Sequence, residues 1–297
     1  MTIGFIGLGL MGQPMALNLA SSLPSAGEAL IVWNRTPSKC EPLRAAGAEV
    51  APSAEAVFDA ARIVILMMVD DGAADIVLER GTSSFAENVR NRIVVNMGTH
   101  SAAYSRALES EIRNAGGRFV EAPVSGSRKP AEAGELIAMV AGEPDAVDEV
   151  RPCLAPMCSE VLDCGAVPSA LATKLSVNLF LITMVTALAE SFHLAGRLGV
   201  DLERFAEVLN AGPMASAVSK VKLQKLLEED FEVQAAITDV LKNADLTAEA
   251  ARTSETASPL LDASRTLYEE TVALGFGAED MAAVVKAIEA RTSKAGS

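Results

Sequence analysis

The chain is poor in aromatic residues, histidine and cysteine. Of its 297 residues, 4% are aromatic, two are histidine and four are cysteine. The four cysteines form no C-x-x-C pair, and no positively charged segment with an apolar run follows Met1. We therefore expect free, buried thiols in a cytoplasmic protein, with neither a disulfide framework nor a metal site.

Basic residues are also scarce relative to acidic ones. The sequence has 25 Lys and Arg against 39 Asp and Glu, a formal net charge of -14. A nucleic-acid surface needs clustered Lys and Arg, so we expect no nucleic-acid partner. Any small anionic ligand must be held by a few local donors, against the field of the whole protein.

The chain has one long apolar stretch. Between Ala166 and Ala189 the only charged residue is Lys174. Crossing a bilayer takes about 20 apolar residues, whereas Ser, Asn and Thr interrupt this run, so we expect no membrane partner. The stretch predicts one helix of about 36 Å, buried nearly all round.

The two halves of the chain differ in pattern. In the first half, short β-type runs alternate with helical stretches; these runs are Thr2 to Ile6, Ala29 to Trp33, Ile63 to Met68, Ile93 to Asn96, Arg118 to Glu121 and Leu136 to Ala141. This alternation predicts a parallel sheet with helices on both faces. After Leu162 the composition is helical throughout. We predict an α/β Rossmann domain over residues 1–163, followed by an all-α domain over residues 164–297, joined by the long helix.

A glycine-rich turn follows the first predicted strand. Its sequence, Gly7-Leu8-Gly9-Leu10-Met11-Gly12, has the pattern G-x-G-x-x-G. The first glycine permits the tight turn, the second lets the backbone approach a pyrophosphate, and the third lets the helix pack on the strand. Amides at the helix start then hold the anion. We predict that these six residues bind a dinucleotide; the alternative is a glycine-rich turn without a ligand.

The end of the second predicted strand indicates which dinucleotide binds. NAD-binding proteins carry an acid there for the ribose 2′-hydroxyl, but this strand ends in Asn34, Arg35 and Thr36, with Lys39 one turn later. Arg35 can fork onto a 2′-phosphate, Thr36 can donate a hydrogen bond and Lys39 adds charge. The pattern favours NADP over NAD, unless both cations are solvated surface residues.

The residues from Phe5 to Leu19 and from Glu121 to Gly134 resemble the two signature segments of the β-hydroxyacid dehydrogenase family, which includes 3-hydroxyisobutyrate dehydrogenase. The second segment, with Ser-Arg-Lys-Pro-Ala-Glu, most resembles the glyoxylate/succinic semialdehyde reductase branch. The resemblance implies that Ser125, Gly126 and Ser127 hold a substrate carboxylate, and a loop with free amides suits an anion. An ordinary surface loop is the alternative.

The family resemblance also implies the catalytic residues. Lys174 and Asn178 match its Lys-x-x-x-Asn pattern and lie on one helix face. An ammonium there can donate a proton to a carbonyl oxygen that gains charge, while Asn holds the substrate. On its own, Lys174 could equally be a helix residue that extends its ammonium to solvent. Lys242 matches the family's Lys-Asp-Leu block, with Asn243 in place of Asp, and is implied to contact substrate and nicotinamide.

Three further residues follow predicted strands at positions where the family contacts the nicotinamide. They are Met68, Val69 and Thr99; the alternative for Met68 is a core side chain. His100 and His193 have no partner motif, and we assign them no role.

These features together predict an NADP-dependent oxidoreductase. It would interconvert a short carbonyl acid, such as glyoxylate or a semialdehyde, and its hydroxy acid, with Lys174 as proton donor and acceptor. The small carboxylate is the expected substrate, and the family implies a homodimer or homotetramer. The alternatives are an imine reductase-like enzyme and a catalytically silent cofactor-binding module.

Overall fold

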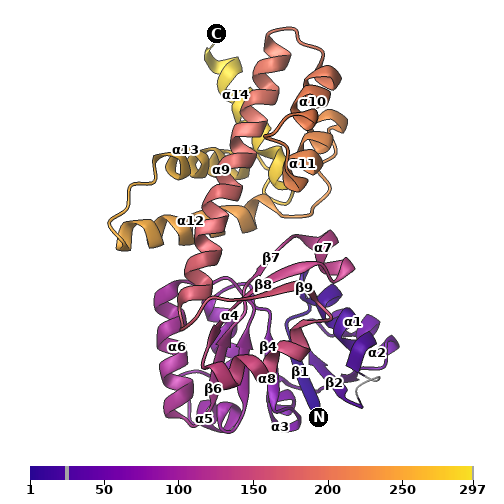
Figure 1. Cartoon of the computed structure of the whole chain (residues 1–297), viewed down its shortest axis with the longest axis vertical. Helices are drawn as coiled ribbons and strands as arrows, with labels where there is room; N and C mark the ends of the chain where they lie inside the picture. Colours follow the sequence, from indigo (N-terminus) through magenta and orange to yellow (C-terminus); the bar gives the residue numbers. More distant parts are fainter. Residues whose placement is uncertain (24–26, 296–297) are drawn as a thin grey trace. The chain divides into compact units, whose positions relative to one another are not determined.

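The computed structural model describes residues 1–23 and 27–295. The chain forms two compact units, Met1–Lys174 and Leu175–Ser297, and Figure 1 labels most of their helices and strands. The boundary expected from the sequence, between residues 163 and 164, precedes helix α9 (Ser169–Arg197), whereas the two units divide within this helix.

Unit 1 alternates strands and helices along the chain. Its strands are β1 (Thr2–Ile6), β2 (Ala29–Trp33), β3 (Glu49–Val50), β4 (Ile63–Leu66), β5 (Ile93–Asn96), β6 (Arg118–Glu121), β7 (Val124–Ser125), β8 (Leu136–Gly142) and β9 (Cys158–Asp163). Its helices before α9 are α1 (Gly12–Ser22), η2 (Pro37–Cys40), α2 (Glu41–Ala45), α3 (Ala54–Ala60), α4 (Asp71–Leu78), α5 (Ser84–Val89), α6 (Ala102–Asn114), α7 (Arg128–Ala133) and α8 (Pro144–Leu154).

The strands of the described residues form one sheet in the order β3-β2-β1-β4-β5-β6-β8-β7, with β9 beside β8. β1 to β6 pair in parallel, with Phe5 opposite Val32 on one side and Ile65 on the other. β8 runs antiparallel to β6 and β7, and β9 pairs with it in parallel. The order 3-2-1-4-5-6 is that of a Rossmann fold, whose ligands bind at the carboxyl ends of the strands.

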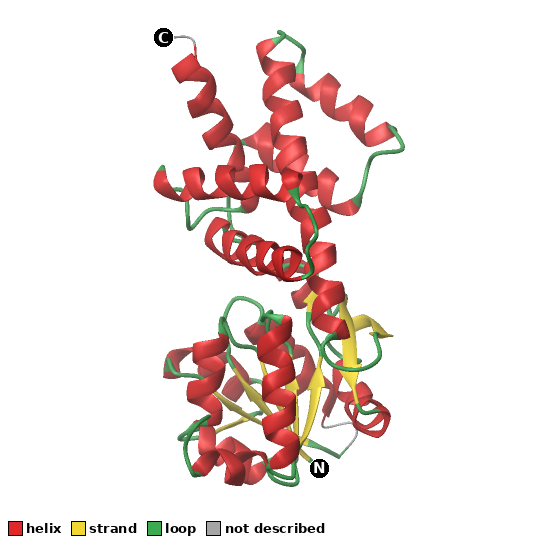
Figure 2. Ribbon diagram, turned by 90° about the vertical axis from the view of Figure 1, so that its left-hand side faces the viewer, coloured by secondary structure: helices red, strands yellow, loops and turns green. Residues whose placement is uncertain are grey.

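The sheet is buried on both faces, as Figure 2 shows for its strands between red helices. Ile3 and Phe5 of β1 point into one core, formed with α1 and α8, whereas Ile6 points into a second core with α3 and α6. Alternate residues of a strand face opposite sides, so a strand between two helical layers is apolar along its length. Continuous apolar runs therefore made these strands predictable.

Three strands were not predicted from the sequence. β3 has two residues and β7 has two, too few for a recognisable period. β9 lies at an edge and exposes most of its side chains, so its composition resembles a loop. The helices after Leu162 follow the prediction.

Unit 2 is helical in its described residues. After α9 its helices are α10 (Leu202–Ala211), α11 (Ala217–Glu228), α12 (Ile237–Thr253), α13 (Pro259–Ala273), η3 (Met281–Val284) and α14 (Val285–Ala295). The parallel sheet covered by helices and the helical second unit confirm the predicted α/β Rossmann domain followed by an all-α domain.

Helix α9 is longer than predicted and is not buried all round, so that expectation was wrong. Ile182 and Val185 pack in the core of unit 2, but Val177, Phe180 and Leu194 are 40%, 67% and 57% exposed. By length and composition alone, α9 is apolar enough to cross a bilayer; its buried face is that of a core helix in a globular unit.

The four cysteines are free. Cys40, Cys153 and Cys158 are buried, and burial raises the pKa of the last two thiols to about 12. Cys164 is partly exposed, so the expectation of buried thiols holds for three of the four.

Candidate active site

The glycine-rich turn has the geometry that its pattern requires. Gly7 has φ +103°, a conformation that side chains rarely adopt. A Cβ on Gly12 would lie 1.9 Å from the Gly7 carbonyl oxygen, so helix α1 can start here only without a side chain. A Cβ on Gly9 would meet nothing within 4 Å. The turn thus packs tightly at its first and third glycines and is open at its second, as a pyrophosphate site demands.

Asn34 ties the end of β2 to this turn. Its side-chain oxygen accepts a hydrogen bond from the Leu8 amide at 2.9 Å, and its nitrogen donates to the Thr36 carbonyl at 3.1 Å. The sequence placed Asn34 near the cofactor without indicating these contacts. Arg35, Thr36 and Lys39 follow it as exposed residues, which leaves their polar groups accessible at the carboxyl end of β2.

The loops after β4 and β5 lie at the same edge of the sheet. Met68 packs against the turn, because a Cβ on Gly7 would meet its Cε at 2.4 Å. Val69 is 61% exposed and Thr99 is half-buried. In a parallel sheet, the carboxyl ends of β1, β2, β4 and β5 share one edge, so this edge carries the predicted cofactor residues of unit 1; Lys242 lies on α12 of unit 2.

His100 joins two of these loops. Its side chain is 0% exposed, its Nδ1 lies 2.5 Å from Asp71 Oδ1, and its ring stacks on Tyr104 at 5.0 Å between centroids. The sequence assigned His100 no role. Its partner is 29 residues away, and no local pattern reveals a contact over that separation.

The predicted carboxylate loop begins as strand β7 and bends sharply. Ser125 is half-buried and pairs with Ile137 of β8. Gly126 has φ +129°, and a Cβ there would meet Leu136 Cδ2 at 2.6 Å. Ser127 precedes α7 in an extended conformation. Two residues separate the end of β6 from the start of β7. The loop therefore lies at the carboxyl edge of the sheet.

Lys174 and Asn178 are buried side chains one turn apart on α9. Lys174 is 8% exposed, and its Nζ forms no ion pair with any residue in the described ranges. Burial lowers the pKa of Lys174 to about 8. Asn178 is 3% exposed, and its Nδ2 has no hydrogen-bond partner among the residues described. A buried donor without a partner costs free energy, which a ligand acceptor would recover.

Lys242 lies on α12 in unit 2 as a half-buried residue. A helix at this position agrees with the all-α domain predicted for residues 164–297. In residues 1–23 and 27–295, no cluster of three or more His, Cys, Asp or Glu side chains is arranged to hold a metal ion.

One surface cavity lies away from these residues. It has a volume of about 580 Å³ and is lined by Asp59, Arg62, Glu87, Arg90 and Arg92, among others. Arg62 and Arg92 flank the amino ends of β4 and β5, opposite the glycine turn. Arg92 is engaged by backbone carbonyls, at 2.6 Å from that of Glu87, so we assign this cavity no part in the site.

Comparison with known proteins gives the family. Residues 2–165 match the NAD binding domain of 6-phosphogluconate dehydrogenase, and residues 169–288 match the NAD-binding domain of NADP-dependent 3-hydroxyisobutyrate dehydrogenase. The chain belongs to the β-hydroxyacid dehydrogenase family. This confirms the resemblance seen in the sequence, and with it an oxidoreductase whose first unit is an NAD(P)-binding domain.

Two plant proteins are similar to this β-hydroxyacid dehydrogenase over most of their length. The chloroplastic glyoxylate/succinic semialdehyde reductase 2 of Arabidopsis thaliana is 31% identical over 294 residues, 99% of this chain and 81% of that protein. Glyoxylate/succinic semialdehyde reductase 1 of the same plant is 30% identical over 290 residues, 97% and 99% of the two chains. The crystal structure of 3-hydroxyisobutyrate dehydrogenase from Salmonella typhimurium has a TM-score of 0.85 at 25% identity, covering 96% of this chain and 99% of that one.

Proposed function

We propose that this protein is an NADP-dependent reductase of a short carbonyl acid, such as glyoxylate or a semialdehyde, which also runs the reverse oxidation of the hydroxy acid. The observation that carries the proposal is the pair Lys174 and Asn178. Among the described residues, the buried Lys174 has no ion pair and the buried Asn178 side-chain nitrogen, one helical turn away, has no hydrogen-bond partner. The two groups provide a proton donor beside a hydrogen-bond donor. Burying the Lys174 and Asn178 polar groups does not itself stabilise helix α9.

The glycine turn fits the pyrophosphate of a dinucleotide. Its open second glycine leaves room for phosphate, and the first amides of α1 point a partial positive charge toward it. Arg35 would fork onto the 2′-phosphate of NADP, with Thr36 and Lys39 adding a hydrogen bond and a charge. Met68, Val69 and Thr99 would line the nicotinamide.

The chemistry of reduction needs a proton as well as a hydride. Bound NADPH supplies the hydride. Lys174 Nζ then donates its proton to the carbonyl oxygen as negative charge develops there, and Asn178 Nδ2 donates a hydrogen bond that holds the substrate. In the reverse direction, neutral Lys174 accepts the hydroxyl proton. A pKa lowered to about 8 makes both forms available near neutral pH.

The substrate carboxylate is assigned to the loop of Ser125, Gly126 and Ser127. Hydroxyl and backbone N–H donors in a sharply bent loop suit a carboxylate and would orient its carbonyl neighbour toward Lys174. Lys242 is assigned to substrate and nicotinamide by its match to the family pattern. We propose residues 1–163 as the cofactor-binding domain and residues 164–297 as the substrate and oligomerisation domain; the carboxylate loop belongs to the first and Lys242 to the second.

A homodimer or homotetramer is part of the proposal. Val177, Phe180, Ala187 and Leu194 are exposed on α9 at spacings of three and seven residues, which places them on one helix face. Such an apolar face suits a second copy of the chain. Phe180→Glu should lower the oligomeric state measured by sedimentation velocity, whereas Ile76→Glu, at a side chain 77% exposed on α4, should not.

The proposal includes a cytoplasmic location, which free thiols suit.

The proposal is tested by NADPH and NADH oxidation with glyoxylate, succinic semialdehyde, methylmalonate semialdehyde and tartronate semialdehyde. We expect NADPH to be preferred, and Arg35→Ala to raise the KM for NADPH by about 10- to 100-fold without affecting NADH. Lys174→Met should lower kcat by about 10²- to 10⁴-fold. Unchanged activity in Lys174→Met would refute the mechanism. Activity on imines alone would favour an imine reductase, and cofactor binding without turnover would favour a silent module.

A further inference from the structure

Glu121 is a fully buried carboxylate that no part of the proposed reaction uses. It is the last residue of β6 and is 0% exposed. Its Oε1 accepts a hydrogen bond from Ser105 Oγ on α6, and its Oε2 accepts one from the Leu171 amide of α9 at 3.3 Å. One side chain therefore links a strand of the sheet and two helices.

Helix α9 depends on this carboxylate at its N-terminus. The first amides of a helix have no partner within it, and Pro168, which precedes the helix, has no side-chain acceptor. The Ser169 amide donates to the Ala166 carbonyl at 2.9 Å. The next two amides, of Ala170 and Leu171, are the ones that stabilise ionised Glu121. A cap normally supplied by the preceding residue thus comes from a strand 50 residues earlier.

The position of Glu121 connects the two groups proposed to act on the substrate. Lys174 lies three residues beyond Leu171, within the first two turns of α9. Ser125 lies four residues beyond Glu121, and the segment between them is anchored, because the Ala122 amide donates to the Asn96 carbonyl at 2.8 Å. A rigid strand end therefore fixes both the start of the carboxylate loop and the start of the lysine-bearing helix.

A buried carboxylate is a costly cap. Desolvation raises the pKa of Glu121 to about 7, while Ser105 and the amides of α9 oppose this shift. Ser, Thr, Asp or Asn in the preceding position would cap a helix without burying a carboxylate. Capping of the helix alone does not require a buried carboxylate. The Glu121 carboxylate also fixes the distance between α9 and the sheet.

We propose that Glu121 is a positioning residue, whose carboxylate holds the first turn of α9 against β6 and so places Lys174 for proton transfer. The inference rests on the proposed function, since it assumes that Lys174 is the proton donor. Glu121 itself touches neither substrate nor cofactor in this role. It acts through the backbone of Ala170 and Leu171.

Two substitutions separate the reach of the side chain from its charge. Glu121→Asp keeps the charge but is one methylene shorter, so the cap can form only if α9 moves. We expect kcat to fall by roughly 10- to 100-fold, with an unchanged Kd for NADPH measured by fluorescence titration. Glu121→Gln keeps an oxygen for the α9 amides and an amide for Ser105 Oγ, so kcat should stay within about fivefold of wild type.

The pH dependence of kcat gives a readout that loss of stability alone would not move. If α9 shifts in Glu121→Asp, water reaches Lys174, and the apparent pKa of kcat should move from about 8 toward 10.5, the ordinary value for lysine. It should stay in place in Glu121→Gln. Glu109→Gln is the matched control, because Glu109 contributes charge near Glu121 and its carboxylate lies 4.0 Å from Arg113 on the same helix, α6; its kcat and pH profile should match wild type.

A wild-type kcat and pH profile in Glu121→Asp, with only a lower Tm, would overturn the proposal. Ser105→Ala carries the same test if Glu121→Asp does not fold, since it frees one carboxylate oxygen. It should lower kcat several-fold and move the apparent pKa upward, and no change in either would also overturn the proposal. Lys174→Met separates failure of the proposed function from failure of the positioning role. If Lys174→Met keeps wild-type activity, the proposed function is wrong. If it loses activity while Glu121→Asp is fully active, only the positioning role is wrong.

Discussion

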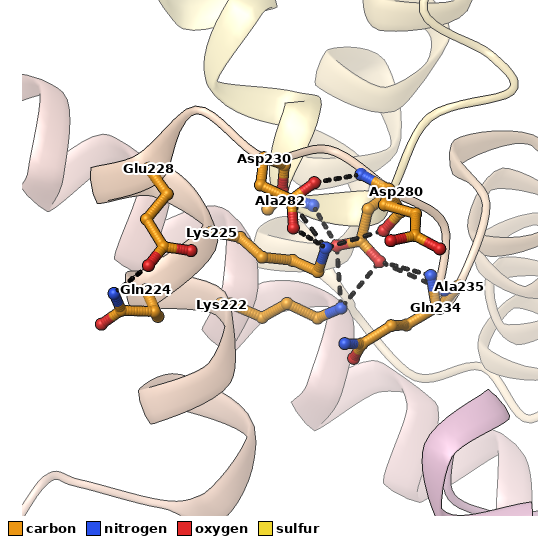
Figure 3. Close-up of polar contacts among 10 residues, drawn as sticks. Lys222, Gln224, Lys225, Glu228, Asp230, Gln234, Ala235, Asp280 and Ala282 are labelled. Carbon is orange, nitrogen blue, oxygen red and sulfur yellow. Dashed lines mark hydrogen bonds and ion pairs between the residues drawn. The ribbon is translucent and has the colours of Figure 1, made fainter. Parts of the chain in front are cut away.

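Lys222 and Asp280 form a buried ion pair in unit 2. Lys222 Nζ lies 2.8 and 2.9 Å from the two carboxylate oxygens, and the two residues are 4% and 0% exposed. The same carboxylate accepts hydrogen bonds from the amides of Gln234, Ala235 and Ala282, as Figure 3 shows. Asp280 thus joins α11, the segment before α12 and the start of η3.

Removing the Asp280 charge should destabilise unit 2 strongly. Asp280→Asn leaves Lys222 buried without a counter-charge, so we expect the free energy of unfolding in urea to fall by about 3–5 kcal/mol. Glu207→Gln, in the exposed Arg204–Glu207 pair, should cost less than about 1 kcal/mol. The double variant Asp280→Asn with Lys222→Met should recover part of the loss, and equal losses in the single and double variants would contradict this account.

The glycine turn provides a contrast between folding and binding. Gly12→Ala places a Cβ against the Gly7 carbonyl, so it should lower the Tm and weaken NADPH binding together. Gly9→Ala meets no protein atom within 4 Å. It should keep the wild-type Tm without cofactor and raise the Kd for NADPH at least about tenfold. Wild-type NADPH binding by Gly9→Ala would show that phosphate does not lie at this glycine.

The pH profiles of kcat for reduction and for oxidation should be mirror images of each other. Reduction needs protonated Lys174, so its kcat should fall about tenfold per pH unit above an apparent pKa of about 8. Oxidation needs neutral Lys174, and its kcat should rise with pH up to the same value. Measurement of both directions between pH 6 and 10 checks this. Profiles that bend in the same sense would exclude one group acting as donor and acceptor.

Lys174 should cost stability at neutral pH. Its pKa is 10.5 in an unperturbed chain and about 8 in the fold. Between these values the unfolded chain binds more protons, so stability rises with pH from 8 to 10.5, and the full penalty is present below 8. Lys174→Met should therefore be more stable than wild type at pH 7 by about 1–3 kcal/mol.

The stability advantage of Lys174→Met should shrink as pH rises toward 10.5. Urea unfolding at pH 7 and at pH 10 measures the difference, and Lys220→Met, at an exposed lysine of α11, is the control expected to show none. If Lys174→Met were less stable than wild type at pH 7, the buried Lys174 would stabilise the fold, which would contradict the destabilisation expected from its desolvation.

Much of unit 1 was predictable because its signals are local. β1, β2, β5 and β6 begin and end at the predicted residues, since strands buried on both faces are continuous apolar runs. The glycine turn was predictable because three positions of one short segment have distinct steric needs. β3, β7 and β9 were not, because pairing at a sheet edge depends on a neighbouring strand more than on their own composition.

Helix α9 shows the limit of composition. The run from Ala166 to Ala189, with one charge, predicts a buried helix, yet Val177 and Phe180 are exposed. Burial is a property of the neighbours that cover a face, and a residue's own hydrophobicity does not specify them.

The sequence by itself determined the buried parallel strands and the helical second half, the glycine turn, the missing acid after β2 and the family, because each depends on residues close together in the chain. Tertiary structure alone decided the burial of Lys174, the cap of α9 by Glu121 and the pairing of Lys222 with Asp280. These contacts join residues 50 and 58 positions apart. Desolvation and hydrogen-bond geometry depend on what the fold brings around a group, so its pKa and its partner emerge only when the chain is packed.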